Sequence, residues 1–455
     1  MKMNYNTVMS KIKEPSVAGS FYTDDAQALK AQIKSFAAKN KNKYEYKTRA
    51  VIVPHAGLIY SGRLAYEGIS QIDGNVKNIF IFAPAHRVGF EGIALSSFDK
   101  WKTPLGEIAV NQDICGELIA KHNAKFNDNA IAPEHAIEIE VPIIQSLFAE
   151  ANIVPVLVGR CDFTVILDIL NEYYQNPENG FVVSSDLSHF LSDAAAQKID
   201  NQTATMIESG NLNGFRFEQA CGAIGIAGLV TFANEKGFSL IRIDMTNSSG
   251  TTGDRSSVVG YGCWFLYEGD KNEFISRYYR DLVIDMAKAS LRESFTGEKP
   301  PSDYPPVFDE FGACFVTLEK HGQLRGCIGS IIAHQPLAAD LVRHAKDAAF
   351  NDYRFDRVTE DELKDIKVSI SLLSDPKRIE FTDEEDLLNK MVPNVDGIII
   401  NDGPYQAVYL PVVWEQLPDK REFLNSLKRK AGLAPDYFSK TFEAYRFASV
   451  YIKED

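Results

Sequence analysis

Short runs of apolar, mostly β-branched residues alternate with stretches of helical periodicity over the first 270 positions of the chain. The apolar runs predict strands, which we place at 49–54, 78–84, 152–159, 180–186, 240–245 and 257–267. Helical spacing predicts helices at 25–39 and 135–150, and Pro142 should kink or shorten the second one. This alternation predicts an α/β fold in which a mixed or parallel sheet is flanked by helices.

The pattern changes after the polar segment 267–274. A helical stretch at 275–295 leads through a Pro-rich segment to pairs of strands joined by tight turns. The pairs are 313–320 with 323–331 around His321-Gly322, and 395–401 with 405–412 around Asp402-Gly403-Pro404. Such pairs predict an α+β region with antiparallel strands. We therefore expect a loose N-terminus at 1–13, a first domain at 14–268 and a second at 269–455.

Composition excludes several classes of protein. Of the 455 residues, 45% are hydrophobic and 24% charged, as in an ordinary folded protein. The net charge of −14 is shared evenly by the two halves, so no basic stripe points to a nucleic-acid partner. The six cysteines form no C-x-x-C pair, which is typical of a reducing compartment. The chain has no apolar run of 18 residues and no signal-peptide pattern, and we expect a cytoplasmic protein without a membrane partner.

Three of the eight histidines directly follow predicted strands. His55 follows the strand at 49–54, His86 the strand at 78–84, and His189 the strand at 180–186, which ends at Asp186. In open α/β sheets the carboxyl ends of the strands gather functional groups, so these side chains are expected to meet in one site.

Two further residues are candidates for the same site. His135 lies at the start of a predicted helix, after Glu134 and one turn before Glu138. Cys221 begins a helix of small residues, where the helix dipole should favour the thiolate. Imidazoles with one anionic ligand suit Fe, Cu, Zn or Ni and leave positions open for substrate, O2 or water. The anion could be Cys221, Asp186 or Glu134, and a further histidine off the metal would serve as the acid–base.

The motifs around these residues resemble the Memo family, also called the AmmeMemoRadiSam system protein B family, over about 14–268. They are EPSVAGSFYTDD, VPHAGLIYSG, APAHRVG, WKTPLGE, EHAIEIEVP, VPVLVG, VSSDLSH and ACGAIG. The family is similar in fold to the LigB subunit of class III extradiol dioxygenases, which are non-haem Fe(II) enzymes. The resemblance therefore implies a metal-binding domain related to oxidoreductases.

The resemblance also implies a role for each residue of the site. His55 and His86 match the two metal-binding histidines of the family, and Cys221 matches its cysteine ligand, which replaces the dioxygenase carboxylate. Asp186 and His189 match the acidic residue and the acid–base histidine beside the metal; His135 matches another pocket histidine. The cysteine puts ring cleavage in doubt and favours Fe(II) or Cu over hard metals, with Zn as a further candidate.

The second half resembles the AMMECR family, or AmmeMemoRadiSam system protein A family, over about 275–455. The motifs are FVTLEKHGQLRGCIGSI, AKDAAFNDYRFDRVTEDEL, VSISLLSDPKRIEF and VDGIIIN. In the first motif Arg325 could clamp a carboxylate or phosphate, and Cys327 could be a nucleophile or redox thiol. Gly326 would allow a ligand or another backbone to come close. Arg354 is a second candidate clamp, or an ion-paired surface residue.

Both families are associated with a radical SAM protein, which the resemblance implies as a partner. Fusion of the two domains suggests a shared task, because it holds two sites at high effective concentration. The leading hypothesis is a metal-dependent, oxidoreductase-like enzyme with an unknown small-molecule or protein substrate. The alternative is a non-catalytic adaptor or metal-handling protein, in which replacing His55 and Cys221 would leave partner binding unchanged.

Overall fold

The computed structural model describes residues 10–39 and 45–454, and it divides the chain into two compact units. The N-terminal unit is Met1–Lys271 and the C-terminal unit is Asn272–Asp455. Of the N-terminus expected to be loose, residues 1–9 lie outside the described part. Ile12 and Lys13 form a short strand, β1 (Ile12–Lys13), so the expectation is wrong for these two residues. The Lys13 side chain is buried.

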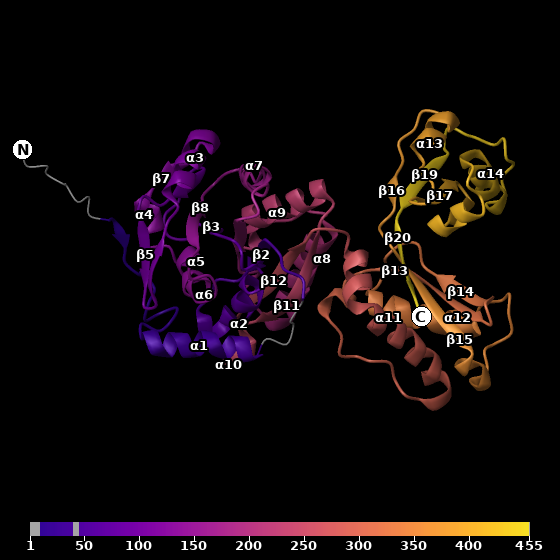
Figure 1. Ribbon diagram of the computed structural model, residues 1–455, viewed down its shortest axis with the longest axis horizontal. Helices are drawn as coiled ribbons and strands as arrows, with labels where there is room; N and C mark the ends of the chain where they lie inside the picture. The colour runs from indigo at the N-terminus through magenta and orange to yellow at the C-terminus, as the bar shows by residue number, and fades with distance from the viewer. Residues whose placement is uncertain (1–9, 40–44, 455) are drawn as a thin grey trace, which may run out of the picture. The chain divides into compact units, whose positions relative to one another are not determined.

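A nine-stranded mixed sheet forms the centre of the N-terminal unit (Figure 1). Its strands are β2 (Ala50–Val53), β3 (Asn78–Pro84), β4 (Ile93–Leu95), β7 (Lys125–Phe126), β8 (Asn152–Val158), β9 (Asn179–Ser184), β10 (His189–Leu191), β11 (Ser239–Asn247) and β12 (Val258–Tyr267). The order is β10-β12-β2-β9-β3-β8-β4-β7, with β11 paired to β12. Strands β2, β9, β3 and β8 are parallel neighbours, so their carboxyl ends share one edge of the sheet. The predicted α/β class and mixed sheet are confirmed.

Helices flank this sheet, and the structure divides one of those predicted. They are α1 (Ala26–Lys39), α2 (Leu58–Ile69), α3 (Gln112–His122), α4 (Asp128–Ile131), α5 (His135–Glu138), α6 (Val141–Leu147), α7 (Thr164–Tyr173), α8 (Asp193–Ser209), α9 (Ala223–Lys236), α10 (Ser249–Thr252) and the 3-10 turn η1 (Phe217–Gln219). Helices α1 and α2 lie on one side of the central strands and α7 and α9 on the other (Figure 1). The helix predicted at 135–150 is split into α5 and α6. Pro142 lies in the first turn of α6. It has no N–H to donate, so it interrupts the predicted helix at this point, as expected.

A small sheet at the edge of the same unit joins the N-terminal segment to the rest. It contains β1, β5 (Lys100–Thr103) and β6 (Gly106–Ala109) in the order β1-β5-β6. The β1–β5 pair is parallel and connects positions almost 90 residues apart in the chain.

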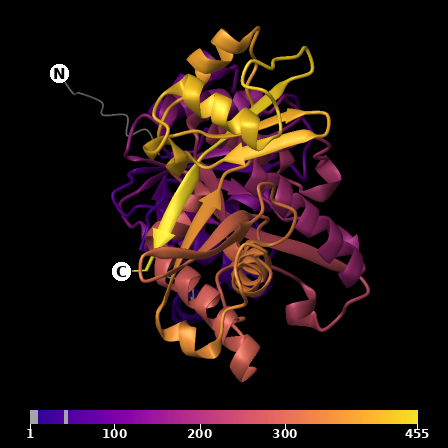
Figure 2. The same cartoon turned by 90° about the vertical axis from the view of Figure 1, so that its right-hand side faces the viewer.

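The C-terminal unit contains two four-stranded antiparallel sheets, shown in orange and yellow in Figure 2. The first has the order β14-β13-β15-β20, formed by β13 (Ala313–Lys320), β14 (Gln323–Gly329), β15 (Ile366–Leu373) and β20 (Ser449–Lys453). The second has the order β16-β19-β17-β18, formed by β16 (Lys377–Arg378), β17 (Gly397–Asp402), β18 (Tyr405–Tyr409) and β19 (Glu443–Phe447). Four buried residues, one from each of β13, β15, β17 and β19, join the two sheets: Ala313, Leu373, Ile399 and Phe447. The predicted α+β class is confirmed.

The helices of this unit are α11 (Lys271–Thr296), α12 (Leu337–Phe350), α13 (Glu384–Lys390) and α14 (Lys420–Lys430), with 3-10 turns η2 (Pro306–Phe308), η3 (Glu360–Lys364) and η4 (Pro411–Glu415). The predicted turn between β13 and β14 has His321 at φ 53° and Gly322 at φ 76°. Two consecutive positive φ values are the geometry of a two-residue hairpin turn. Among the described residues, no helix combines the length and the apolar character needed to cross a bilayer.

Candidate metal centre

Three of the residues predicted from the sequence meet at one edge of the large sheet. His55, His86 and Asp186 each come two residues after the end of a parallel strand, β2, β3 and β9 respectively. These three strands are neighbours in the order β2-β9-β3, so residues more than 100 positions apart in sequence become adjacent.

One donor atom each from His55, His86 and Cys221 forms a compact group. The three donors lie within 4.8 Å of one another, and the Cys221 Sγ is 3.2 Å from the His55 Nε2. Metal bonds to these atoms are about 2.0–2.3 Å long, so two ligands of one ion can be at most about 4.6 Å apart. The group is therefore already close to the spacing that a single ion requires. Its two imidazoles and one sulfur also suit a borderline or soft metal.

Each imidazole is oriented by a hydrogen bond at its other nitrogen. The His55 Nδ1 lies 2.8 Å from the Ser184 hydroxyl, which in turn donates to the Ala136 carbonyl at 2.8 Å. The His86 Nδ1 lies 3.0 Å from a Glu134 carboxylate oxygen, and the His86 backbone N–H donates to the other oxygen at 2.7 Å. Both rings are thus oriented with Nε2 toward the donor group, as is usual for metal-binding histidines.

Burial controls the charge state of two of these ligands. The pKa of His55 is well below its usual range, first because the ring is buried and then because of His86 and His135, so the imidazole is neutral. Neutral imidazole is the form that binds metals. Burial, together with Asp186, raises the pKa of the Cys221 thiol to about 12. The expectation that the helix dipole favours its thiolate is therefore wrong for the metal-free protein, because α9 begins only at Ala223 and desolvation dominates.

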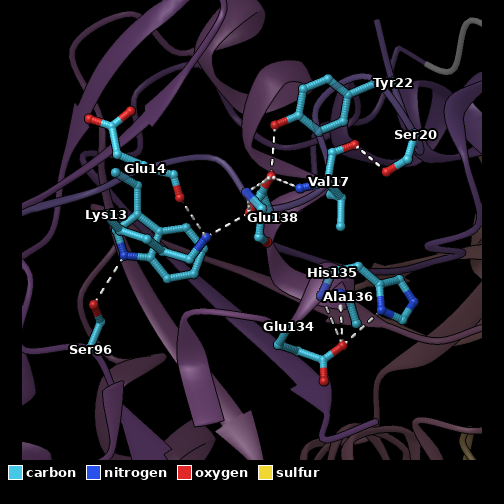
Figure 3. A network of polar contacts seen from close by, with 12 residues as sticks. Lys13, Glu14, Val17, Ser20, Tyr22, Ser96, Glu134, His135, Ala136 and Glu138 are labelled. Carbon is cyan, nitrogen blue, oxygen red and sulfur yellow. Dashed lines mark hydrogen bonds and ion pairs between the residues drawn. The ribbon is translucent and has the colours of Figure 1, made fainter. Parts of the chain in front are cut away.

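His135 lies beside the two histidine ligands and shares a carboxylate with His86. Its ring centroid is 4.7 Å from that of His86 and 5.5 Å from that of His55, and its Nδ1 is 3.0 Å from Glu134 (Figure 3). Burial alone would raise the pKa of Glu134, but the adjacent His135 ring and hydrogen bonds from His86 outweigh it and lower the pKa. Glu134, one of the three anionic candidates, is therefore an ionised partner of the histidines.

Asp186 contacts a residue of the donor group, whereas His189 lies outside that group. The Asp186 carboxylate accepts the backbone N–H of His55 at 2.8 Å, so it holds the His55 backbone rather than the His189 ring. Burial raises the pKa of Asp186 to about 7. The pKa of His189 is lowered, mainly because the ring is partly buried and also because of the nearby His86. The lowered pKa favours the neutral imidazole, and the acid–base role of His189 stays a prediction.

Glu138 faces away from the histidines and binds the N-terminal segment. Its carboxylate accepts hydrogen bonds from the Tyr22 hydroxyl at 2.9 Å and the Lys13 ammonium at 2.6 Å, and from the Ser16 and Val17 backbone N–H groups (Figure 3). Lys13 and Glu138 are both almost fully buried. The local sequence gave no signal for this pairing, because its partners are 125 positions apart.

An apolar pocket of about 440 Å³ opens beside Cys221. It is lined by Phe82, Pro84, Phe90, Val158, Phe217 and Ile224, and by a second cysteine, Cys161. Cys161 follows β8, the fourth parallel strand, so the strand-end reasoning that found the histidines could have found it as well. Ser184 could have been found as a polar residue inside a buried apolar run.

The second candidate site, in the C-terminal unit, is only partly available to a ligand. Arg325 binds the Glu362 carboxylate with two nitrogens, at 3.1 and 3.2 Å, and the Asp356 carbonyl with a third. The carboxylate that it clamps therefore belongs to the protein. A Cβ atom at Gly326 would lie 2.0 Å from the Ala348 carbonyl oxygen, so the close approach there is by the backbone of α12. Cys327 remains partly exposed.

Comparison with known proteins agrees with the two-unit architecture. The family model described as Memo-like protein matches residues 13–265, more than half of the chain. The chain belongs to the Memo-like family. A second model, described as AMMECR1, matches residues 284–452, so this Memo-like protein carries an AMMECR1 domain after its Memo-like domain.

Several curated proteins are similar to the Memo-like part. A MEMO1 family protein of Aquifex aeolicus is 30% identical over 271 residues, covering 56% of this chain and all of that protein. The MEMO1 family protein Ta0237 of Thermoplasma acidophilum is 32% identical, covering 55% of this chain and 96% of its own length. MEMO1 family protein C4H3.04c of Schizosaccharomyces pombe is 34% identical over 192 residues, which are 39% of this chain and 61% of that protein.

Among solved structures, the uncharacterized protein PH0010 from Pyrococcus horikoshii is similar to part of the chain. It is 32% identical and covers 40% of this chain and 90% of its own, with a TM-score of 0.35.

Proposed function

We propose that the Memo-like unit is a metal-dependent enzyme of the oxidoreductase class, in which His55, His86 and Cys221 hold one divalent ion. The observation that carries this proposal is the convergence of three donors within 4.8 Å, with both imidazoles oriented through Nδ1. Three protein ligands leave a coordination position open, which is characteristic of catalytic rather than structural sites.

The donor chemistry selects the metal. A thiolate and two imidazoles suit Fe(II), Cu or Zn and disfavour Mg²⁺ and Ca²⁺, which prefer oxygen ligands. Among these we propose Fe(II) first, because the resemblance to the LigB-type dioxygenases points to non-haem iron. The raised pKa of the Cys221 thiol is consistent with binding, because a bound cation stabilises the thiolate that desolvation disfavours.

The surrounding residues have separate tasks in this proposal. When bound, Fe(II) or Cu would supply Lewis-acid and redox chemistry at the open position. Ser184 and Glu134 keep the two imidazoles in place, and the pocket beside Cys221 binds the apolar body of a small substrate and excludes water. His189, which is neutral, accepts a proton from the substrate.

The partner and the compartment are also part of the proposal. We infer a radical SAM protein as partner, because both families are associated with one. The six cysteines of the chain are free, which supports a reducing compartment such as the cytoplasm.

Metal analysis of anaerobically purified protein tests the proposal. We expect one Fe, Cu or Zn ion per chain by mass spectrometry, and loss of that ion in the His55→Ala and Cys221→Ala variants. The matched control is Cys161→Ala, because Cys161 lines the same pocket without belonging to the donor group, and this variant should keep the metal. Full metal retention in either ligand variant would remove that residue from the centre. A normal metal content with no turnover alongside a radical SAM partner would instead favour the adaptor hypothesis.

A further inference from the structure

A row of polar side chains crosses one face of the first C-terminal sheet. Thr317 on β13 pairs with Cys327 on β14 and with Ser369 on β15. Directly opposed residues project from the same face, so these three side chains lie in line. The residues on either side of Thr317, Val316 and Leu318, are fully buried on the other face. The side chains of Thr317 and Ser369 therefore lie on the same face of the sheet as that of Cys327.

Cys327 and Ser369 in this row could each interact with a ligand. The Thr317 hydroxyl donates to the Cys327 sulfur at 3.2 Å, which stabilises negative charge on that sulfur. The Ser369 side chain is 6% exposed, and its hydroxyl has no hydrogen-bond partner among the described residues. An unpartnered buried hydroxyl destabilises the fold, and a bound ligand or water would relieve this cost.

Two cations lie at the cysteine end of the row. Arg354 donates to the Cys327 carbonyl at 3.1 Å, and its charge is balanced by a bidentate pair with Asp352. Lys430, at the end of α14, donates to the Val408 carbonyl at 3.0 Å. Lys430 has no carboxylate within salt-bridge distance in the described part of the chain, so the group keeps one uncompensated positive charge.

Packing places Lys430 near this face of the sheet, because Val408, whose carbonyl it binds, packs against the same apolar cluster as Phe315, two residues before Thr317 on β13. Burial lowers the pKa of Lys430, the positive charge of Arg354 lowers it further, and the Cys327 sulfur raises it. A cation that is repelled by a neighbouring guanidinium gains most from an added anion.

We propose that Cys327, Thr317, Ser369 and Lys430 form a second ligand site, which binds a small molecule carrying a carboxylate or phosphate group and presents it to the Cys327 sulfur. Lys430 attracts the anionic group, and Ser369 supplies a free hydroxyl. Nothing in this site depends on a metal in the other unit.

The cysteine in such a site reacts with electrophiles that carry a negative charge. The Cys327 thiol gives its proton to water, and the sulfur forms a bond to the electrophilic carbon. The leaving group departs with the electron pair of the broken bond. This is a substitution without net oxidation, so no further reactant is required.

Alkylation with two matched reagents tests the proposal on the full-length protein. Iodoacetate and iodoacetamide have the same electrophilic carbon and the same leaving group, iodide, and differ in charge. The rate of labelling is measured for each cysteine by digestion and mass spectrometry. We expect the iodoacetate-to-iodoacetamide rate ratio at Cys327 to exceed that at Cys161 on the order of tenfold, since a charge interaction near the surface has this size. Cys161 is the internal reference, because its charged neighbours are acidic. Burial raises the pKa of Cys161, and Asp162 and Glu91 raise it further.

Two lysine variants assign the effect. Lys430→Gln should lower the ratio at Cys327 about fivefold and leave that at Cys161 unchanged. Lys420→Gln makes the same charge change at the other end of α14, about 15 Å away, and should change neither ratio. Lys430 is exposed, so its replacement should leave the unfolding midpoint unchanged and the result interpretable. Equal ratios at Cys327 and Cys161, or an unchanged ratio in Lys430→Gln, would overturn the proposal.

Discussion

The two units place a cysteine in opposite surroundings. In the Memo-like unit, Cys221 is half-buried beside imidazoles and a carboxylate, and desolvation raises its pKa to about 12. In the AMMECR1 domain, Cys327 is partly exposed, accepts a hydroxyl hydrogen bond and lies near the cations Arg354 and Lys430. The first environment disfavours the thiolate in the metal-free protein. The second favours reaction with an anionic molecule.

The two sites also differ in what holds them together. Buried carboxylates join distant parts of the chain in the Memo-like unit: Glu134 holds His86 at the candidate metal centre, and Glu138 holds Lys13 of the N-terminal segment. Around Cys327 the main ion pair joins Asp352 to Arg354, only two residues further on, and the arginine side chain is 43% exposed. The metal centre should therefore be sensitive to loss of a single carboxylate, whereas the thiol site should tolerate charge changes without unfolding.

The largest expected effect is that of Glu138→Gln on the stability of the Memo-like unit. The substitution leaves the Lys13 ammonium buried without its counter-ion, and breaking a buried pair costs about 3–5 kcal/mol. Urea unfolding followed by hydrogen–deuterium exchange of peptides from residues 10–39 and 45–271 measures this loss. Glu14→Gln is the control, because Glu14 pairs with Lys102 at the surface and should cost less than about 1 kcal/mol. Equal losses in the two variants would show that the buried pair does not anchor the segment.

A smaller effect is expected for Glu134→Gln, this time on metal affinity. The carboxamide cannot hold both His86 and His135 as the carboxylate does, and loss of such a partner typically lowers metal affinity about 10–100-fold. Competition with a chelator of known affinity measures the change. Glu150→Gln, at an exposed position beyond α6, should retain the original affinity. An unchanged affinity in Glu134→Gln would mean that Glu134 does not prepare His86 for the metal.

Asp340 in the AMMECR1 domain tests whether a buried carboxylate has the same importance there. Burial alone would raise its pKa, but the nearby His344 ring, at 3.2 Å, and hydrogen bonds from Gln335 and Ser330 outweigh this and lower the pKa to about 2. A folded-state pKa below the ordinary value of 3.8 stabilises the fold at all pH values above about 4, by about 2 kcal/mol. This contribution disappears as the pH falls from about 4 to about 2.

Asp340→Asn should therefore reduce the unfolding free energy of the AMMECR1 domain at neutral pH, and the difference from the unaltered protein should shrink in acid. Asp285→Asn, at an exposed position of α11, is the control. Denaturant unfolding at a series of pH values measures both. A difference that is the same at pH 7 and at pH 2 would contradict the role given to the Asp340 carboxylate.

Much of the metal centre follows from local sequence patterns, because strand ends determine where side chains go. The apolar runs that end near Val53, Pro84 and Ser184 placed His55, His86 and Asp186 at one sheet edge, as the structure does. The parallel pairing that makes them neighbours is a general property of α/β sheets. The same reasoning, applied to β8, would have added Cys161.

The remaining features depend on contacts that the local sequence does not contain. The pairing of Lys13 with Glu138 and the proximity of Lys430 to Cys327 each join residues about 100 or more positions apart, through tertiary packing. The pKa of Cys221 was expected to fall because of the helix dipole, but desolvation, which depends on the whole surrounding fold, decides its sign. Arg325 was expected to bind a ligand, and only the folded chain brings Glu362 to it.

Cobalt substitution of the metal-free, full-length protein tests the proposed centre most directly. Binding of Co(II) to a thiolate gives a charge-transfer absorption in the near ultraviolet, which reports sulfur ligation independently of turnover. We expect one Co(II) per chain with this band, its loss in Cys221→Ser, and its retention in Cys327→Ser and Cys161→Ser. A band that persists unchanged in Cys221→Ser, or Co(II) binding without any thiolate band, would contradict a centre formed by His55, His86 and Cys221.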